Sequence, residues 1–166
     1  TSAQVAALTT AAFAALTTAD LSALTSAAVV GITTAEVGTL DSAEVQALGT
    51  DIANMGAAAM AALTSDQMVS LTTAQITAIA TDDLQALTTD NIIAMGSDQI
   101  RALTTQQTYN LTTDQINAIE TGDLEVMRKE QIVAMTTAQF SNMTTDQLVA
   151  LTTGQVAAME TQDVAA

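Results

Sequence analysis

The chain repeats an eight-residue unit along its whole length. Each complete unit closes on Leu, Ile or Met, from Leu8 to Met159, and the period is broken only by the seven-residue stretch "GTDIANM" at 49–55. A fixed short period of this kind indicates a repeat architecture in which each unit packs mainly on its neighbours. We therefore expect residues 1–166 to form a single octapeptide-repeat array. Because the array starts and stops inside its own repeat, we also expect it to be part of a longer chain.

The eight positions of the unit differ in how much they vary. Position 2 is Ser or Thr in 19 of 21 units, counting the truncated last one, and position 5 is apolar in every unit except the one with Thr108. Position 7 is small, mostly Ala, and position 8 is always Leu, Ile or Met, whereas positions 3 and 6 vary freely. Fixed positions are expected to face a core and free ones to face water.

A single continuous helix does not fit this period. At about 100° per residue, eight residues overshoot two helical turns by about 80°, so positions 5 and 8 would sweep around the axis and give no constant apolar face. The chain must therefore turn once in every unit. The Thr-Thr pair at positions 1 and 2 is the predicted place for the turn.

Helix-end signals support a helix between one Thr pair and the next. A Ser or Thr at position 2 can act as the N-cap, and acids often follow it, where the helix dipole favours them. Position 1 is Gly at 49, 56 and 96, as expected for a residue that follows a helix. We predict a helix of about six residues, from position 3 to position 8. The predicted structural caps are Thr73, Thr113, Thr145 and Thr153.

Such short helices are unstable alone, so they must stack on one another. The predicted fold class is all-α, a solenoid of very short helices with one helix per octapeptide. A β-solenoid is the alternative, but it requires alternating apolar residues and enrichment in β-branched or aromatic ones, and this chain is rich in Ala, Gln, Met and Leu. Predicted core residues are Ile76, Ile79, Ile116, Ile119, Leu148 and Leu151.

A weaker period of 40 residues is also present. "ATDDLQAL" at 80–87 resembles "ETGDLEVM" at 120–127 and "ETQDVAA" at 160–166, which predicts five octads per superhelical turn. Five octads per turn would stack four acids in one column, which is a candidate oxygen-ligand site for Ca²⁺. The column consists of Glu44, Asp83, Asp123 and Asp163. The alternative is that these acids recur only because the first turn of a helix favours negative charge.

Composition narrows the function classes. Eighteen acids against three cations give a formal net charge of −15, which repels nucleic acid and anionic membrane surfaces. No apolar run is long enough to cross a bilayer. The chain has no Cys and no His, and no Ser or Thr stands beside a plausible base. We expect no enzyme activity and no cofactor.

The segments "LTTAQ" at 71–75, "LTTDQ" at 111–115 and "LTTGQ" at 151–155 resemble the Thr-rich octapeptide tracts of large secreted or surface-attached bacterial proteins, including adhesin-like and appendage-associated chains. This resemblance implies an extracellular or cell-surface structural role, such as a stalk, a spacer or a filament subunit. The expected partner is then a second copy of the chain, because a solenoid without polar caps exposes its core at its ends. The alternative is a module that binds a protein, a glycan or Ca²⁺.

Overall fold

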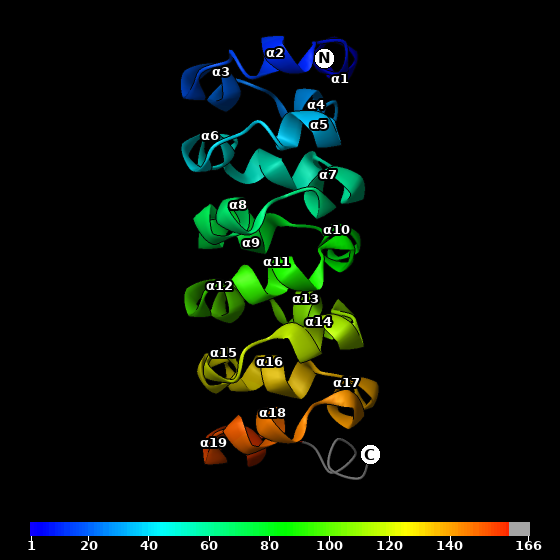
Figure 1. The fold of residues 1–166 in the computed structure, drawn as a ribbon. Coiled ribbons are helices and arrows are strands. Elements are labelled where there is room, and N and C mark those ends of the chain that lie inside the picture. The colour runs from blue at the N-terminus through cyan, green and yellow to red at the C-terminus, as the bar shows by residue number, and fades with distance from the viewer. Residues whose placement is uncertain (160–166) are drawn as a thin grey trace.

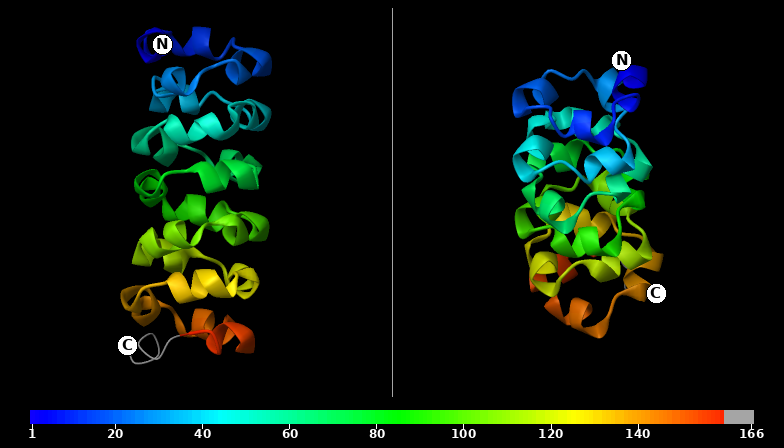
Figure 2. Two further views of the ribbon diagram at one scale, coloured as in Figure 1. Left: turned by 180° about the vertical axis from the view of Figure 1, so that it is seen from behind. Right: turned by 45° about the horizontal axis from the view of Figure 1, so that its top comes forward.

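The computed structural model describes residues 1–159, which form an elongated stack of short helices with no strand in that range (Figure 1). Each octad contributes one helix, so the predicted all-α solenoid is confirmed. Successive helices turn through the layers of the stack from α1 at one end to α19 at the other, as the view from behind and the tilted view also show (Figure 2). None of the helices in residues 1–159 is long and apolar enough to cross a membrane.

The elements in chain order are α1 (Ser2–Ala6), α2 (Thr10–Phe13), α3 (Thr18–Ser22), α4 (Ser26–Val29), α5 (Thr34–Val37), α6 (Ser42–Ala47), the 3-10 helix η1 (Gly49–Asn54), α7 (Ala57–Ala61), α8 (Ser65–Ser70), α9 (Thr73–Ala78), α10 (Thr81–Ala86), α11 (Thr89–Ala94), α12 (Ser97–Ala102), α13 (Thr105–Asn110), α14 (Thr113–Ala118), α15 (Thr121–Val126), α16 (Lys129–Ala134), α17 (Thr137–Asn142), α18 (Thr145–Ala150) and α19 (Thr153–Val156).

The regular helices run from position 2 to position 7, one residue earlier than predicted. In α9 the helix ends at Ala78, and Ile79 (φ −59°, ψ 128°) has left the helical conformation. Ala80 (φ −65°, ψ 151°) is also extended, and α10 starts at the next residue. Two non-helical residues at positions 8 and 1 therefore turn the chain between consecutive helices.

Between three and four octads make one superhelical turn. Helices that lie three units apart pack together, as α9 does with α12, α10 with α13 and α11 with α14. Hydrogen bonds between adjacent coils join residues 28 and 31 positions apart, which is just under four octads. The predicted five octads per turn is therefore wrong. The 40-residue period marks where acidic units recur in the sequence and not where the coil closes.

The core is one continuous column built from positions 5 and 8. Five of the six predicted core residues are buried: Ile76, Ile79, Ile116, Ile119 and Leu151. The prediction for Leu148 is wrong, because its side chain is 44% exposed. Its helix α18 packs on α15 of the preceding coil, but no helix of a following coil covers it within residues 1–159. Thr108 stands at an apolar position, fully buried, and its hydroxyl donates to the Thr104 carbonyl oxygen at 3.0 Å.

The seven-residue unit is accommodated by a local change of helix type. Its residues form η1, which follows α6 after the single residue Leu48, without the extended link of other units. Gly49 has a φ of 54° and Gly56 a φ of 78°, and these are the residues with positive φ in the described part of the chain. Gly96, grouped with them from the sequence, is instead an ordinary extended N-cap with φ −84°.

We predict that Gly56→Ala destabilises the solenoid by about 1–3 kcal/mol, because φ 78° with ψ 161° lies in a region that only glycine enters easily. An added Cβ would meet no neighbouring atom within 4 Å, so the effect isolates backbone strain. Urea unfolding measures it. The control is Gly122→Ala inside α15, where a Cβ is equally free of contacts and alanine is the better helix former. Equal effects of the two substitutions would contradict the prediction.

Candidate functional site

The helix caps are the Thr residues at position 1 and not those at position 2. Thr112 is extended (φ −70°, ψ 160°), and its hydroxyl accepts a hydrogen bond from the Gln115 backbone N–H at 3.1 Å. The Gln115 side-chain Oε1 in turn accepts from the Thr112 N–H at 3.0 Å, which completes a capping box. The predicted caps Thr73, Thr113, Thr145 and Thr153 are instead the first helical residues, and the caps are Thr72, Thr112, Thr144 and Thr152.

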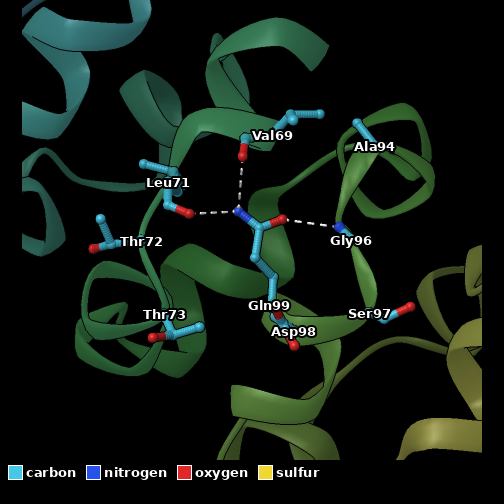
Figure 3. Close-up of a pocket in the computed structure, with 9 residues that line it drawn as sticks. All are labelled: Val69, Leu71, Thr72, Thr73, Ala94, Gly96, Ser97, Asp98 and Gln99. Carbon is cyan, nitrogen blue, oxygen red and sulfur yellow. Dashed lines mark hydrogen bonds between the residues drawn. The ribbon is translucent and has the colours of Figure 1, made fainter.

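The same glutamine side chain also joins two coils. Gln115 Nε2 donates to the carbonyl oxygens of Leu84 at 2.8 Å and Leu87 at 2.9 Å, which belong to the unit four octads earlier. The Gln side chain is buried, with 2% exposure. Gln99 makes the corresponding bonds to Met68 and Leu71 and a longer one, at 3.4 Å, to Val69; the bonds to Leu71 and Val69 are drawn in Figure 3. We call this arrangement the amide clamp. The clamp glutamines are Gln67, Gln75, Gln99, Gln107, Gln115, Gln131, Gln139, Gln147 and Gln155.

The amide clamp satisfies backbone groups that a short helix leaves open. A six-residue helix leaves about four carbonyls at its end without an intrahelical donor, and buried carbonyls need a donor. Each clamp bond contributes on the order of 1 kcal/mol net, while an unmade bond costs about 1–3 kcal/mol. Sequence reasoning missed the role of position 4 because only the constant apolar positions 5 and 8 were assigned to the core. The signal was present, since Thr-x-x-Gln is a capping-box pattern.

Glu36 occupies the clamp position of α5 but cannot act as a clamp. Its side chain is 2% exposed, and its Oε2 accepts from the Thr33 N–H at 2.7 Å and from the Thr33 hydroxyl at 2.8 Å. Its Oε1 is buried without a hydrogen-bond partner. The repeat register, 31 and 28 residues back, assigns the carbonyls of Val5 and Leu8 to this position. A glutamate side chain has no amide NH2 group, so the donor that binds both carbonyls in the other units is missing there.

We predict that Gln115→Glu destabilises the chain by about 2 kcal/mol, because it replaces the donor to two buried carbonyls with an acceptor. Thermal unfolding at neutral pH measures the change. The matched control is Gln106→Glu, which adds the same charge at an exposed position of α13. Glu36→Gln is the reciprocal change and should stabilise by about 1 kcal/mol. A destabilising Glu36→Gln, or equal effects of Gln115→Glu and Gln106→Glu, would contradict the clamp.

The predicted carboxylate column does not form in the described residues. Glu44 lies in α6, which packs on α3 and α8, whereas Asp83 lies in α10, which packs on α7 and α13. Asp123 lies in α15, which packs on α12 and α18, and Asp163 lies outside the described residues. Residues 1–159 contain no group of three acids that could hold a metal ion. The prediction of this column was wrong because it assumed five octads per superhelical turn.

These acids instead occupy the clamp position of their own units. Glu44 Oε2 accepts from the Asp41 N–H at 2.8 Å, and Asp123 accepts from the hydroxyl of Ser97 in α12. Asp51 likewise accepts from the hydroxyl of Ser26, at 2.6 Å. For Asp83 the residue at the same spacing back along the chain is Ala57 in α7, which has no hydroxyl. Asp83 therefore lacks the donor that the equivalent acids have.

The environment of Asp83 affects its titration. Burial raises the pKa of Asp83 above the ordinary value of 3.8, and the neighbouring carboxylate of Asp82 raises it further. Asp20 shows the opposite, because the Thr17 backbone N–H and then the Thr17 hydroxyl donate to its carboxylate and lower its pKa. An acid with a raised folded-state pKa binds its proton more tightly in the folded chain than in the unfolded one. Stability from Asp83 is therefore greatest below 3.8 and falls as the pH rises through its folded pKa.

We predict that Asp83→Asn raises the melting temperature relative to wild type at pH 7, and that this difference shrinks as the pH falls through the raised folded pKa of Asp83 and is smallest below 3.8. The reason is that the substitution removes a partly desolvated charge that only the ionised wild type carries. Melting curves between pH 3 and pH 7 test it. Asp146→Asn removes the same charge from an exposed position of α18 and serves as control. A pH-independent difference for Asp83→Asn would overturn the assignment.

Arg128, one of the three basic residues, also makes hydrogen bonds between coils. Arg128 stands at the N-cap position of α16, and its Nε donates to the Arg101 carbonyl oxygen at 3.2 Å. Its Nη2 donates to the Leu103 carbonyl oxygen at 2.9 Å. The Arg128 guanidinium thus adds to the clamp that Gln131 makes with Leu103. Arg128 joins coils, which gives it a structural role.

A hollow of about 500 Å³ opens where one unit lacks its Thr cap (Figure 3). Gly96 occupies position 1 there, and no atom lies within 4 Å of the place where its Cβ would be. Val69, Leu71 and Ala94 give the hollow an apolar side, and Ser97 and Asp98 give it a polar one. The hollow holds no His, Cys or paired carboxylates. It is a place for a small contact, without the groups that chemistry on a substrate requires.

Comparison with known proteins identifies the repeat. The profile of the ALTTAQ repeat family matches residues 13–50, 76–113 and 116–153, which together span more than half of the 166 residues. Neither the curated proteins nor the solved structures include a match to the chain.

Proposed function

The chain belongs to the ALTTAQ repeat family, and we propose that it is a non-catalytic structural segment, a rigid spacer or stalk within a bacterial extracellular or cell-surface protein. The observation that supports this proposal is the amide clamp, which recurs from α8 to α19. Buried hydrogen bonds that join each coil to the one before resist bending as well as separation of the coils. A segment in which most units from α8 to α19 perform the same mechanical task needs no specialised site.

Two further features support a spacer. The core runs through the stack without interruption from Val5 to Leu151, so there is no joint at which the rod would hinge. The high negative charge keeps rods soluble and apart. Surface location rests on the resemblance of the Thr-rich repeat to surface-protein tracts. Self-association into filaments remains a prediction, which sedimentation velocity over a range of concentrations tests.

A binding module is the alternative function, and the hollow at Gly96 is the observation that favours it. The spacer accounts for the whole array, whereas the hollow accounts for one unit.

We predict that a tandem duplication of residues 88–143, which are seven octads, lengthens the particle by about two coils, or about 16–20 Å at 8–10 Å between packed helices. Small-angle X-ray scattering measures the maximum dimension, and the unaltered chain is the control. A rod predicts this increment with an unchanged cross-section. A flexible or globular particle, or an increment far below 20 Å, would contradict the spacer. Saturable thermal stabilisation by Ca²⁺ or a glycan would support the binding module instead.

A further inference from the structure

The hydroxyl at position 2 is retained more consistently than the fold requires. Position 2 is Ser or Thr in 19 of 21 units, whereas position 1, which supplies the cap, is Thr in only 13 of 21. Positions 3 and 6, which are also exposed, have diverged freely. A surface position that keeps one residue type while its exposed neighbours vary is expected to have a function. That function is not helix capping, because position 1 supplies the cap.

The structure gives the position 2 hydroxyl almost no bonding role. Within residues 1–159, Ser26 and Ser97 donate to acids of the next coil, and the other position 2 hydroxyls make no hydrogen bond to protein. Most of these side chains are exposed, including Thr73, Thr89 and Thr105. The hydroxyl at position 1, by contrast, is occupied as an acceptor of a backbone N–H in the regular units.

The two units without the hydroxyl show that a helix forms without it. Ala57 begins α7, and Lys129 begins α16, a full six-residue helix whose Gln131 still clamps Ile100 and Leu103. Neither unit disturbs the stack. The Ser or Thr at position 2 is therefore dispensable for helix formation and for coil packing.

We propose that the exposed position 2 Thr and Ser residues are acceptors for covalent attachment of a neutral sugar, so that the solenoid carries a regularly spaced carbohydrate coat. In the transfer, the Thr hydroxyl oxygen bonds to the anomeric carbon of a nucleoside-diphosphate sugar. The bond between that carbon and the phosphate oxygen breaks, and the nucleoside diphosphate leaves with the electron pair. The hydroxyl proton passes to a base of the transferase.

Charge favours a neutral group over phosphate at these positions. Position 3, directly after the hydroxyl, is Asp in many units, as in Asp90, Asp114 and Asp146, and the chain already carries −15. Phosphates on the whole array would add like charge beside each of these acids. A sugar adds bulk and hydrogen-bonding groups without that repulsion. This inference does not depend on the spacer function.

The test is mass spectrometry of the chain isolated from the cells that make it, against the unmodified recombinant chain. We expect a native mass that exceeds the sequence mass by whole sugar residues. Peptides should carry the sugar on position 2 and not on position 1. Each Thr-Thr pair contains both positions and therefore provides its own control. A native mass equal to the sequence mass overturns the proposal. So do phosphate increments, or sugars spread equally over both positions.

Paired variants made in the native host separate modification from folding. Thr105→Val should lower the native mass by one sugar residue, while the recombinant variant melts as wild type does. Thr104→Val removes the cap whose hydroxyl accepts from the Gln107 N–H at 3.1 Å, so it should lower the melting temperature and leave the sugar on Thr105. Loss of sugar from both variants, or from neither, would overturn the assignment to position 2.

Discussion

The side-chain amide at position 4 is the interaction on which the solenoid depends. Its oxygen holds the start of its own helix, and its nitrogen holds the end of a helix in the preceding coil. Gln139, for example, accepts from the Thr136 N–H and donates to the Leu111 carbonyl at 2.7 Å. Helices of six residues have too few internal hydrogen bonds to stand alone. One buried side chain therefore provides hydrogen bonds to the start of one helix and to the end of another. Apolar packing at positions 5 and 8 provides the remaining stabilisation.

Periodicity predicted the units of this fold better than it predicted their boundaries. The rotation of a helix over eight residues required a turn in each unit, and Ile76 and Ile116 were recognisable as core. The cap was placed one residue late because either Thr of a pair can cap a helix. The two are distinguished only by the hydrogen bond that the N–H of the first Thr donates to Oε1 of Gln75 or Gln115. The number of units per turn depends on how helices pack, which the eight-residue pattern does not encode.

The 40-residue period marks where acidic units recur and does not correspond to a superhelical turn. From Glu44 onward, every fifth unit carries an acid at the clamp position, as at Asp83 and Asp123, while the coil closes in fewer than four units. The two periods are out of step, so successive acidic units face different sides of the rod. Between α8 and α19, the two units in which an acid replaces the clamp amide, those of Asp83 and Asp123, therefore lie on different sides of the rod.

The seven-residue unit shows how the solenoid responds to a change in length. Gln67 reaches back 30 and 27 residues to Val37 and Leu40, where Gln115 reaches back 31 and 28, yet its bonds are as short at 2.7 Å. The glycines at its ends absorb the deletion, and the coils beyond it keep their pairing. Because alignment is restored within one unit, whole repeats can be gained or lost by unequal recombination without spoiling those on either side. The length of such a protein is then free to evolve independently of its fold.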